Sequence, residues 1–286
     1  MNIFNLWYVN IIISLFFIVI WDQSFKVVTK TSKKDGALTI LVQLLVGVML
    51  LIWVPFFEMR FPTDPRIYFF LGLAIIFYTI NDRVGTTVRR GIEASTFSML
   101  YQASTVFLVI IGLLFFREPF VFTKIIGAIL IIFSNILVFY KQGEVKLNKY
   151  IAIGILGQLS LATAISLDVG NAENFNIAFY MAVTYFVPPI LIYLIERPKI
   201  SDIKSEFING NKKAILLTAF AWSITALTSI RAYILGSVTM VAPIAAVSVI
   251  LNVFAGYIFL KERDNLLKKT IAAIVIIIGV VLIQLW

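Results

Sequence analysis

The segments FFREPFVFTK (residues 115–124) and FLKERDNLLK (residues 259–268) are two versions of one sequence element. In each of them an apolar run ends in a basic residue followed by glutamate, and a lysine opens the next apolar run. One ungapped shift places Ser104, Gly112, Glu118 and Lys124 on Ser248, Gly256, Glu262 and Lys268. Apolar matches between membrane segments are common, whereas a shared register of Glu, Lys and Gly is not. The sequence therefore predicts an internal repeat.

The apolar character of the repeat extends along the whole chain. Of the 286 residues, 60% are hydrophobic and 14% are charged, and the mean hydropathy is +0.97. A soluble domain is closer to about 45–50% apolar and about 25% charged. Because one water-soluble core cannot bury so much apolar surface, the composition indicates an all-α integral membrane protein that crosses the bilayer many times.

Segments of about 20 apolar residues, the length that crosses the hydrocarbon of a bilayer, predict ten transmembrane helices. They cover residues 6–28, 36–57, 67–83, 94–116, 121–140, 150–168, 174–195, 213–233, 237–260 and 268–286. We expect residues 1–145 and 146–286 to form two five-helix repeats of one integrated membrane domain. Because each repeat has an odd number of spans, the two copies are expected to be inverted, as in many secondary transporters.

Lys and Arg are distributed unevenly between the connections. Most of the 24 lie in or beside the connections that follow the odd-numbered spans. Since cytoplasmic loops are enriched in these residues, this pattern predicts that those connections are cytoplasmic and that both termini face the other side. The same explanation accounts for the net charge of +9, so no nucleic-acid partner is expected.

The composition excludes several kinds of chemistry. The chain has no Cys and no His, which removes disulfides, thiolate metal sites and Ser-His-Asp catalysis. Neither G-x-G-x-x-G nor G-x-x-x-x-G-K-[ST] occurs, so direct nucleotide hydrolysis has no support. We therefore expect a protein that is not an enzyme and that uses no metal or other cofactor.

Two helix-ending glutamates, each followed by a glycine-containing helix, are the most specific motifs of the chain. They occur in REPFVFTKIIGAILIIFSNILV (residues 117–138) and in KERDNLLKKTIAAIVIIIGVVLI (residues 261–283). With them the sequence resembles the drug/metabolite transporter superfamily, in its ten-helix EamA-like branch. Val241-Ala242-Pro243 precede Glu262 at the spacing typical of that family.

The first span adds to the resemblance and also departs from it. Trp21 with Phe25 is similar to the family's Trp-Gly-x-x-Phe pattern, but Asp22 replaces the usual small residue after the tryptophan. Thr105 and Val249 stand where the family often has proline. The resemblance implies ten helices around a central cavity, alternating access and a small organic solute. It also implies cytoplasmic termini, opposite to the distribution of Lys and Arg.

Asp22 lies deep in the first predicted span, and Lys26 follows one helical turn later. A charge at the bilayer centre costs about 2.5–3.5 kcal/mol on insertion scales. One interpretation is that the two residues neutralise each other as an i, i+4 pair while the lysine stem snorkels to the interface. The other is that Asp22 is a cavity carboxylate that binds a cationic group or a proton. The second resembles the use of a first-helix acid by small multidrug-resistance relatives.

Other polar residues interrupt the remaining spans. Asp168 ends the sixth span and falls on Asp22 in a second alignment of the halves. Arg231 is the only basic residue in its connection and is a candidate partner for a substrate carboxylate. Candidates for the cavity wall are Tyr78, Tyr101, Gln102 and Trp222.

Four further charged residues are expected to be structural. Glu118 and Glu262 match in the repeat and lie at helix ends, where they would meet nearby Lys, Arg or helix N-termini. Asp82 and Arg83 end the third span and are expected to pair locally or to lie at the interface.

We therefore expect a secondary-active transporter in the cell membrane, an exporter of a small organic solute that works by alternating access. The solute is expected to be an amino-acid-like zwitterion or a cationic metabolite, with proton or substrate exchange as the driving force and Asp22 as the proton carrier. A multidrug cation/proton antiporter is the alternative within transport. A membrane enzyme acting on lipid-linked substrates and a non-transporting scaffold are less well supported. Solute and membrane lipids are the expected partners, the oligomeric state stays open, and a monomer fits the absence of a G-x-x-x-G motif.

Overall fold

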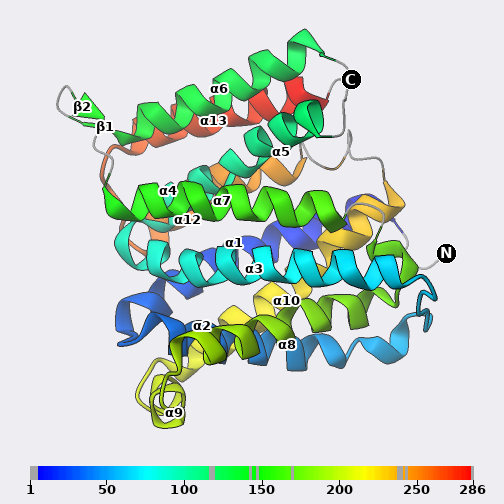
Figure 1. The fold of residues 1–286 in the computed structure, drawn as a ribbon. Coiled ribbons are helices and arrows are strands. Elements are labelled where there is room, and N and C mark those ends of the chain that lie inside the picture. The colour runs from blue at the N-terminus through cyan, green and yellow to red at the C-terminus, as the bar shows by residue number, and fades with distance from the viewer. Residues whose placement is uncertain are drawn as a thin grey trace.

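The computed structural model describes residues 6–115, 120–141, 144–145, 148–168, 171–236, 241 and 244–284. Glu118, Ala242 and Pro243 lie outside the described residues, so the expectations for them have no structural counterpart here. Within the described part the fold is all-α apart from one short hairpin (Figure 1).

The elements follow one another as long helices joined by short connections. The helices are α1 (Trp7–Thr31), α2 (Asp35–Leu51), α3 (Pro65–Gly91), α4 (Ala94–Tyr101), α5 (Ala103–Leu114), α6 (Phe122–Phe139), α7 (Lys149–Asp168), α8 (Ile177–Glu196), α9 (Ile200–Ile208), α10 (Lys212–Leu235), α12 (Ser248–Phe259) and α13 (Leu266–Gln284). Short 3-10 helices cover Val54–Phe56 and Ala172–Asn174. Strands β1 (Tyr140–Lys141) and β2 (Glu144–Val145) pair antiparallel, with Tyr140 opposite Val145.

Eight helices among the described residues are long and apolar enough to cross a membrane. They are Trp7–Thr31, Asp35–Phe56, Pro65–Gly91, Ala94–Leu114, Lys149–Asp168, Ile177–Glu196, Lys212–Leu235 and Leu266–Gln284. Two further apolar helices, Phe122–Val138 and Ile244–Phe259, are shorter. The chain is an integral membrane protein, as its composition indicated.

Polar side chains in the connections set where several helices begin. Asp64 precedes α3 and accepts a hydrogen bond from the Arg66 N–H at 2.9 Å. Asn176 does the same for the N–H of Phe179 at the start of α8, and Asn211 for the N–H of Ala214 at the start of α10. Each cap satisfies a backbone donor that the first turn of a helix leaves without a partner.

The third span continues two turns beyond its predicted end at residue 83. Hydropathy falls after Arg83, yet α3 extends to Gly91. The added turns are partly buried against other helices, which supplies partners for their polar side chains. Thr86 and Arg89 are buried, and the hydroxyl of Thr86 is 2.8 Å from that of Thr39 on α2.

The fourth span is interrupted at Gln102, where α4 ends and α5 begins. The Gln102 N–H donates to the Met99 carbonyl, and the Thr105 N–H donates to the Gln102 carbonyl, each at 3.1 Å. These i to i−3 bonds form a tightened turn within the span. A bond of the same type, from the Val247 N–H to the Ile244 carbonyl, lies just before α12.

Helices far apart in sequence pack side by side. α1 packs against α10, α3 against α7, α2 against α8, α6 against α13 and α4 against α12 (Figure 1). The backbones of α6 and α13 approach each other closely, since a Cβ built at Gly127 would lie 2.4 Å from the Gly279 carbonyl oxygen. Small residues permit such contacts between membrane helices.

The two ends of the bundle differ in which segments they carry. α1 begins and α13 ends on the right in Figure 1, while the α1–α2 turn and α9 lie on the left. The left end therefore contains the connections richest in Lys and Arg, including Lys30, Lys33 and Lys34. We refer to it as the basic end.

Candidate functional site

A buried ion pair joins the first and third spans. Asp22 on α1 accepts a hydrogen bond through Oδ1 from Arg89 Nη1 on α3, with the two atoms 2.5 Å apart. The side chains are only 4% and 2% exposed, respectively. Removing two charges from water costs several kcal/mol for each ion, so such a pair persists only where further hydrogen bonds hold it.

Amide and hydroxyl groups supply those bonds. Asn252 Nδ2 on α12 donates to Asp22 Oδ2 at 2.8 Å and lies 3.3 Å from Ser98 Oγ on α4. Gln23 Nε2 donates to Asn252 Oδ1 at 3.0 Å. We call Asp22, Gln23, Arg89, Ser98 and Asn252 the buried polar cluster. It draws on four helices and on both halves of the chain.

One acceptor of the cluster has no donor within the described part of the chain. Gln23 Oε1 is buried and has no hydrogen-bond partner among the described residues. A buried acceptor without a donor costs about 1–3 kcal/mol, so this oxygen is suited to a donor supplied from outside the chain.

Aromatic rings enclose the guanidinium of the cluster. The Arg89 guanidinium carbon lies 3.6 Å from the centre of the Phe97 ring and 4.0 Å from that of Trp21. Trp21 stacks on Trp222 with ring centres 4.0 Å apart, and Trp222 Nε1 donates to the Tyr185 hydroxyl. Aromatic faces attract cations electrostatically, so these rings stabilise the buried guanidinium and form an apolar wall beside it.

A second polar group lies two turns from Arg89 on the same face of α3. Asp82 accepts hydrogen bonds from Gln43 Nε2 on α2 and from Asn81 Nδ2. Asp82 and Arg83 are expected to pair locally or to lie at the interface, and among the described residues they do not pair with each other. Arg83 forms its ion pair with Glu196 of α8, because α8 ends beside α3 at the basic end.

Lys26 does not pair with Asp22 and does not snorkel. Its side chain is 4% exposed, and Nζ donates to the carbonyl oxygens of Arg89 at 2.5 Å, Arg90 at 3.2 Å, and Ile92. These are the carbonyls left without partners at the C-terminus of α3, where a cation is favoured. The i, i+4 interpretation of the first span is therefore wrong.

Asp168 is held by two hydroxyl groups. Tyr78 on α3 donates to Oδ2 at 2.8 Å, and Tyr180 on α8 donates to Oδ1. Asp168 ends α7 on the side of the bundle opposite to the basic end. The described hydrogen bonds of the Asp168 carboxylate therefore come from tyrosines, whereas those of Asp22 come from Arg89 and Asn252.

The other predicted site residues are Arg231, Tyr101, Gln102 and Trp222, of which Tyr101 lies close enough to Asp22 and Arg89 to interact with their charges. The Arg231 guanidinium lies 5.2 Å from the centre of the Phe57 ring. Tyr101 and Gln102 are half-buried at the break between α4 and α5. Trp222 belongs to the aromatic wall of the buried polar cluster. Of the predicted set, the structure thus brings Asp22 and Trp222 to one place, and Tyr78 and Asp168 to another.

Glu262 lies on the N-terminus of α4. Its carboxylate accepts hydrogen bonds from the N–H groups of Ala94 at 2.7 Å and Ser95 at 3.2 Å, and from the Ser95 hydroxyl at 2.6 Å. Lys269 of α13 pairs with Glu93 just before the same helix. A carboxylate at a helix N-terminus meets free donors and the positive end of the helix dipole. These contacts join the two halves at the basic end.

Sequence reasoning missed Gln23, Arg89, Ser98 and Asn252. Arg89 was placed in a connection because the run VGTTVRRG is polar. Asn252 stands within the apolar run SVILNVFAG, so its isolation among apolar residues was a usable signal. Gln23 adjoins Asp22 and carried the same signal, whereas Ser98 had none.

The comparisons with known proteins identify a fold and no family. No protein-family model matches this chain, and no curated protein matches it. A solved structure, titled only as the crystal structure of a protein, aligns with a TM-score of 0.57 and 12% sequence identity, covering 96% of this chain and 96% of that one. With its apolar helices, the chain is a multi-pass helical membrane protein.

Proposed function

We propose that the chain is a secondary-active transporter of a small organic zwitterion, of the size and charge of an amino acid. The observation that carries this proposal is the Asp22–Arg89 ion pair, which is buried between membrane-spanning helices and flanked by aromatic rings. Ionisable residues inside membrane spans commonly mark solute or ion pathways.

The helix pairings support a plan of two inverted five-helix repeats. If α4 and α5 together count as the fourth span, α1 in the first half corresponds to α7 in the second, and α3 corresponds to α10. The α1–α10 contact then has its equivalent in the α7–α3 contact. The same correspondence maps the pairs α2–α8, α4–α12 and α6–α13 onto themselves. Tightened turns precede the matching residues Ser104 and Ser248 in the fourth and ninth spans. Interrupted helices of this kind surround the binding sites of many inverted-repeat transporters.

Charge balance favours a zwitterion over a simple cation. In the described state, Asp22 and Arg89 neutralise each other. A zwitterion that enters between them brings a carboxylate to Arg89 and an ammonium group to Asp22, so each buried charge keeps a partner. A cation that bound to Asp22 would leave Arg89 unpaired, and an unpaired buried charge costs about 3–5 kcal/mol. The multidrug cation antiporter is for this reason the weaker candidate.

The neighbouring residues fit the same solute. Gln23 Oε1, which has no donor among the described residues, is an acceptor for an ammonium N–H. Trp21 and Trp222 present an apolar face on which a solute side chain would pack. In this proposal the Asp22–Arg89 pair forms again when the solute leaves, and the protein works in the cell membrane as an exporter.

Counterflow in proteoliposomes tests the proposal. Vesicles loaded with an unlabelled amino-acid mixture and containing the full chain are expected to accumulate a radiolabelled amino-acid mixture from outside. Asp22→Asn and Arg89→Gln should each reduce the initial rate at least about tenfold, because a hydrogen bond to a charged group contributes about 1.5–3 kcal/mol. Arg89→Lys keeps the charge and tests the role of the guanidinium. Asp64→Asn, at the exposed pair with Arg66, is the matched control.

Two outcomes would contradict the proposal. One is wild-type counterflow that Arg89→Gln leaves unchanged. The other is an absence of amino-acid counterflow together with pH-driven transport of ethidium that depends on Asp22, which would favour the multidrug antiporter. Thermal unfolding of each variant distinguishes lost transport from lost folding.

A further inference from the structure

α9 is an amphipathic helix that lies at the basic end of the bundle. Ile200 and Ile208 are 58% and 60% exposed, whereas Glu206 is buried. Glu206 Oε1 accepts the backbone N–H groups of Lys33 at 3.0 Å and Lys34 at 2.9 Å. The helix is therefore fixed to the α1–α2 turn and presents apolar side chains where the bundle ends. Amphipathic helices of this kind lie in the interface between lipid and water.

An apolar pocket separates α9 from α2. Its volume is about 340 Å³, and its lining consists of Leu41, Leu45, Ile203, Lys204, Phe207 and Ile208. On α2 two leucines one turn apart face the pocket, and on α9 Ile203 and Phe207 have the same spacing. Lys204 is the one cationic residue in the lining, and its side chain is exposed. Such a lining accepts a hydrocarbon chain that carries an anion at one end.

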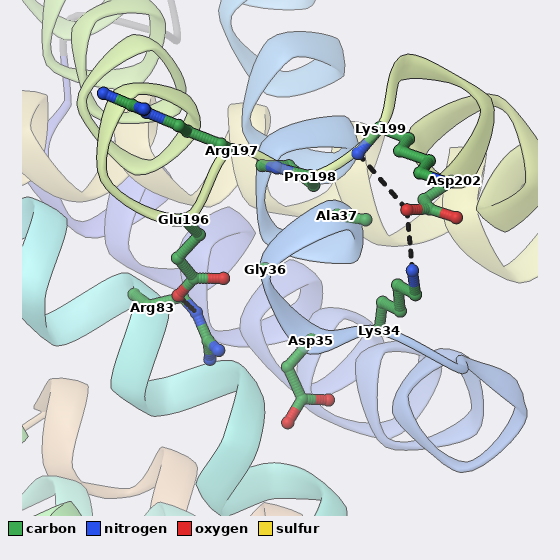
Figure 2. Close-up of a pocket in the computed structure, with 10 residues that line it drawn as sticks. All are labelled: Lys34, Asp35, Gly36, Ala37, Arg83, Glu196, Arg197, Pro198, Lys199 and Asp202. Atoms are coloured by element: carbon green, nitrogen blue, oxygen red, sulfur yellow. Dashed lines mark hydrogen bonds and ion pairs between the residues drawn. The ribbon is translucent and has the colours of Figure 1, made fainter.

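A second cavity nearby is lined by both basic and acidic residues. Figure 2 shows this cavity of about 420 Å³, which is lined by Lys34, Asp35, Gly36, Ala37, Arg83, Glu196, Arg197, Pro198, Lys199 and Asp202. Asp202 is ion-paired with Lys34 at 2.7 Å and accepts the Lys199 N–H at 3.2 Å, while Glu196 is ion-paired with Arg83. Arg197 extends away from both of these acids in Figure 2.

The charges of the α8–α9 segment therefore favour an anion. Its acids already have cationic partners or backbone donors, and Arg197, Lys199 and Lys204 add positive charge on the same short segment. Anionic lipid headgroups are attracted to such juxtamembrane clusters by about 1 kcal/mol per basic residue.

We propose that an anionic phospholipid occupies this place, with one acyl chain in the α2–α9 pocket and its phosphate at Lys204. The apolar pocket favours an acyl chain, and the adjoining cations favour a negatively charged headgroup. Neither observation depends on the proposed transport function. The bound lipid would fasten α9 to α2, and through Glu206 and Asp202 to the α1–α2 turn.

Thermal unfolding of the purified full chain in a neutral detergent tests this site. Added phosphatidylglycerol is expected to raise the melting temperature by about 2–4 °C more than phosphatidylcholine, as expected for a ligand that binds only the folded state. Lys204→Glu should abolish this difference, and Lys204→Gln should reduce it. Lys213→Glu, which changes an exposed lysine at the start of α10, is the control and should retain the difference.

Further measurements distinguish the contribution of the acyl chain from that of the headgroup. Glycerol 3-phosphate has the anion without acyl chains and is expected to leave the melting temperature unchanged. Leu45→Gln should weaken the effect of phosphatidylglycerol from the apolar side, and native mass spectrometry should show fewer bound lipids for Lys204→Glu. The proposal is overturned if the two lipids stabilise equally, if glycerol 3-phosphate accounts for the effect, or if Lys204→Glu responds like the wild type.

Discussion

Asp22 of α1 and Arg89 of α3 lie 2.5 Å apart, with both side chains almost fully buried, although 67 positions separate them in the sequence. The pair fixes the middle of the first span against the last turn of the third. Asn252 binds the second oxygen of the same carboxylate from the other half of the chain.

The two members of the ion pair should depend on each other. Asp22→Asn or Arg89→Gln alone should destabilise the protein by about 3–5 kcal/mol, because each leaves a buried charge without a partner. The free energy of unfolding of the double variant should fall by clearly less than the sum of the two single decreases. Reversible unfolding in mixed detergent measures the three values. Strict additivity would contradict the described pair.

Asn252→Ala should destabilise the protein by about 1–3 kcal/mol, because it removes the donor to Asp22 Oδ2 and the acceptor for Gln23 Nε2. Asn209→Ala, at an exposed residue after α9, is the control and should change stability little. The same unfolding assay compares them. Equal effects of the two substitutions would show that Asn252 does not hold the cluster.

Glu262→Gln should cost about 0.5–2 kcal/mol, because an amide at the N-terminus of α4 lacks the negative charge that the helix dipole favours. Glu58→Gln is the matched control, since Glu58 pairs with Arg60 at an exposed place, where ion pairs contribute little. The decrease in stability caused by Glu262→Gln should persist at high salt because the contact is buried. A loss of the same size at both residues would argue against this role.

Gly127→Ala should lower the stability of the protein, whereas Gly72→Ala should leave it unchanged or raise it. A Cβ at Gly127 would lie 2.4 Å from the Gly279 carbonyl oxygen, so this substitution must separate α6 from α13. A Cβ at Gly72 meets nothing within 4 Å, so alanine there should be neutral or stabilising by up to about 1 kcal/mol. Melting temperatures of the two variants decide the matter, and a stable Gly127→Ala protein would contradict the close approach.

The contact between α9 and the α1–α2 turn should weaken in acid. The hydrogen bond and charge of Lys34 lower the pKa of the Asp202 carboxyl below its ordinary value. A lowered folded-state pKa means that the contribution is complete above the ordinary Asp pKa of about 3.9 and is lost as the pH falls through the lower value. Hydrogen exchange of residues 200–208 should accelerate in that range, and Asp202→Asn should remove this pH dependence. An unchanged dependence in the variant would assign it to another group.

The helices of the bundle were largely predictable because their signal is local. Runs of apolar residues specify α1, α2, α7, α8, α10 and α13 within a few residues of the expected spans. Where local hydropathy does not predict the structure, contacts with another helix explain the difference. The end of α3 is polar and still helical because Thr86 and Arg89 are buried against other helices. The segment after α8 contains α9, whose contacts with the α1–α2 turn no local pattern indicates.

The sequence by itself determined that this is a membrane protein, that a short sequence element occurs twice, and that a charge lies deep in the first span. Each of these follows from composition or from the residues of short segments, which need no knowledge of the fold. Only the tertiary structure decided that Asp22 binds Arg89 and Asn252, while Lys26 caps the end of α3. A buried charge takes the partner that packing brings within hydrogen-bond distance, and that partner lies on another helix, far away along the chain.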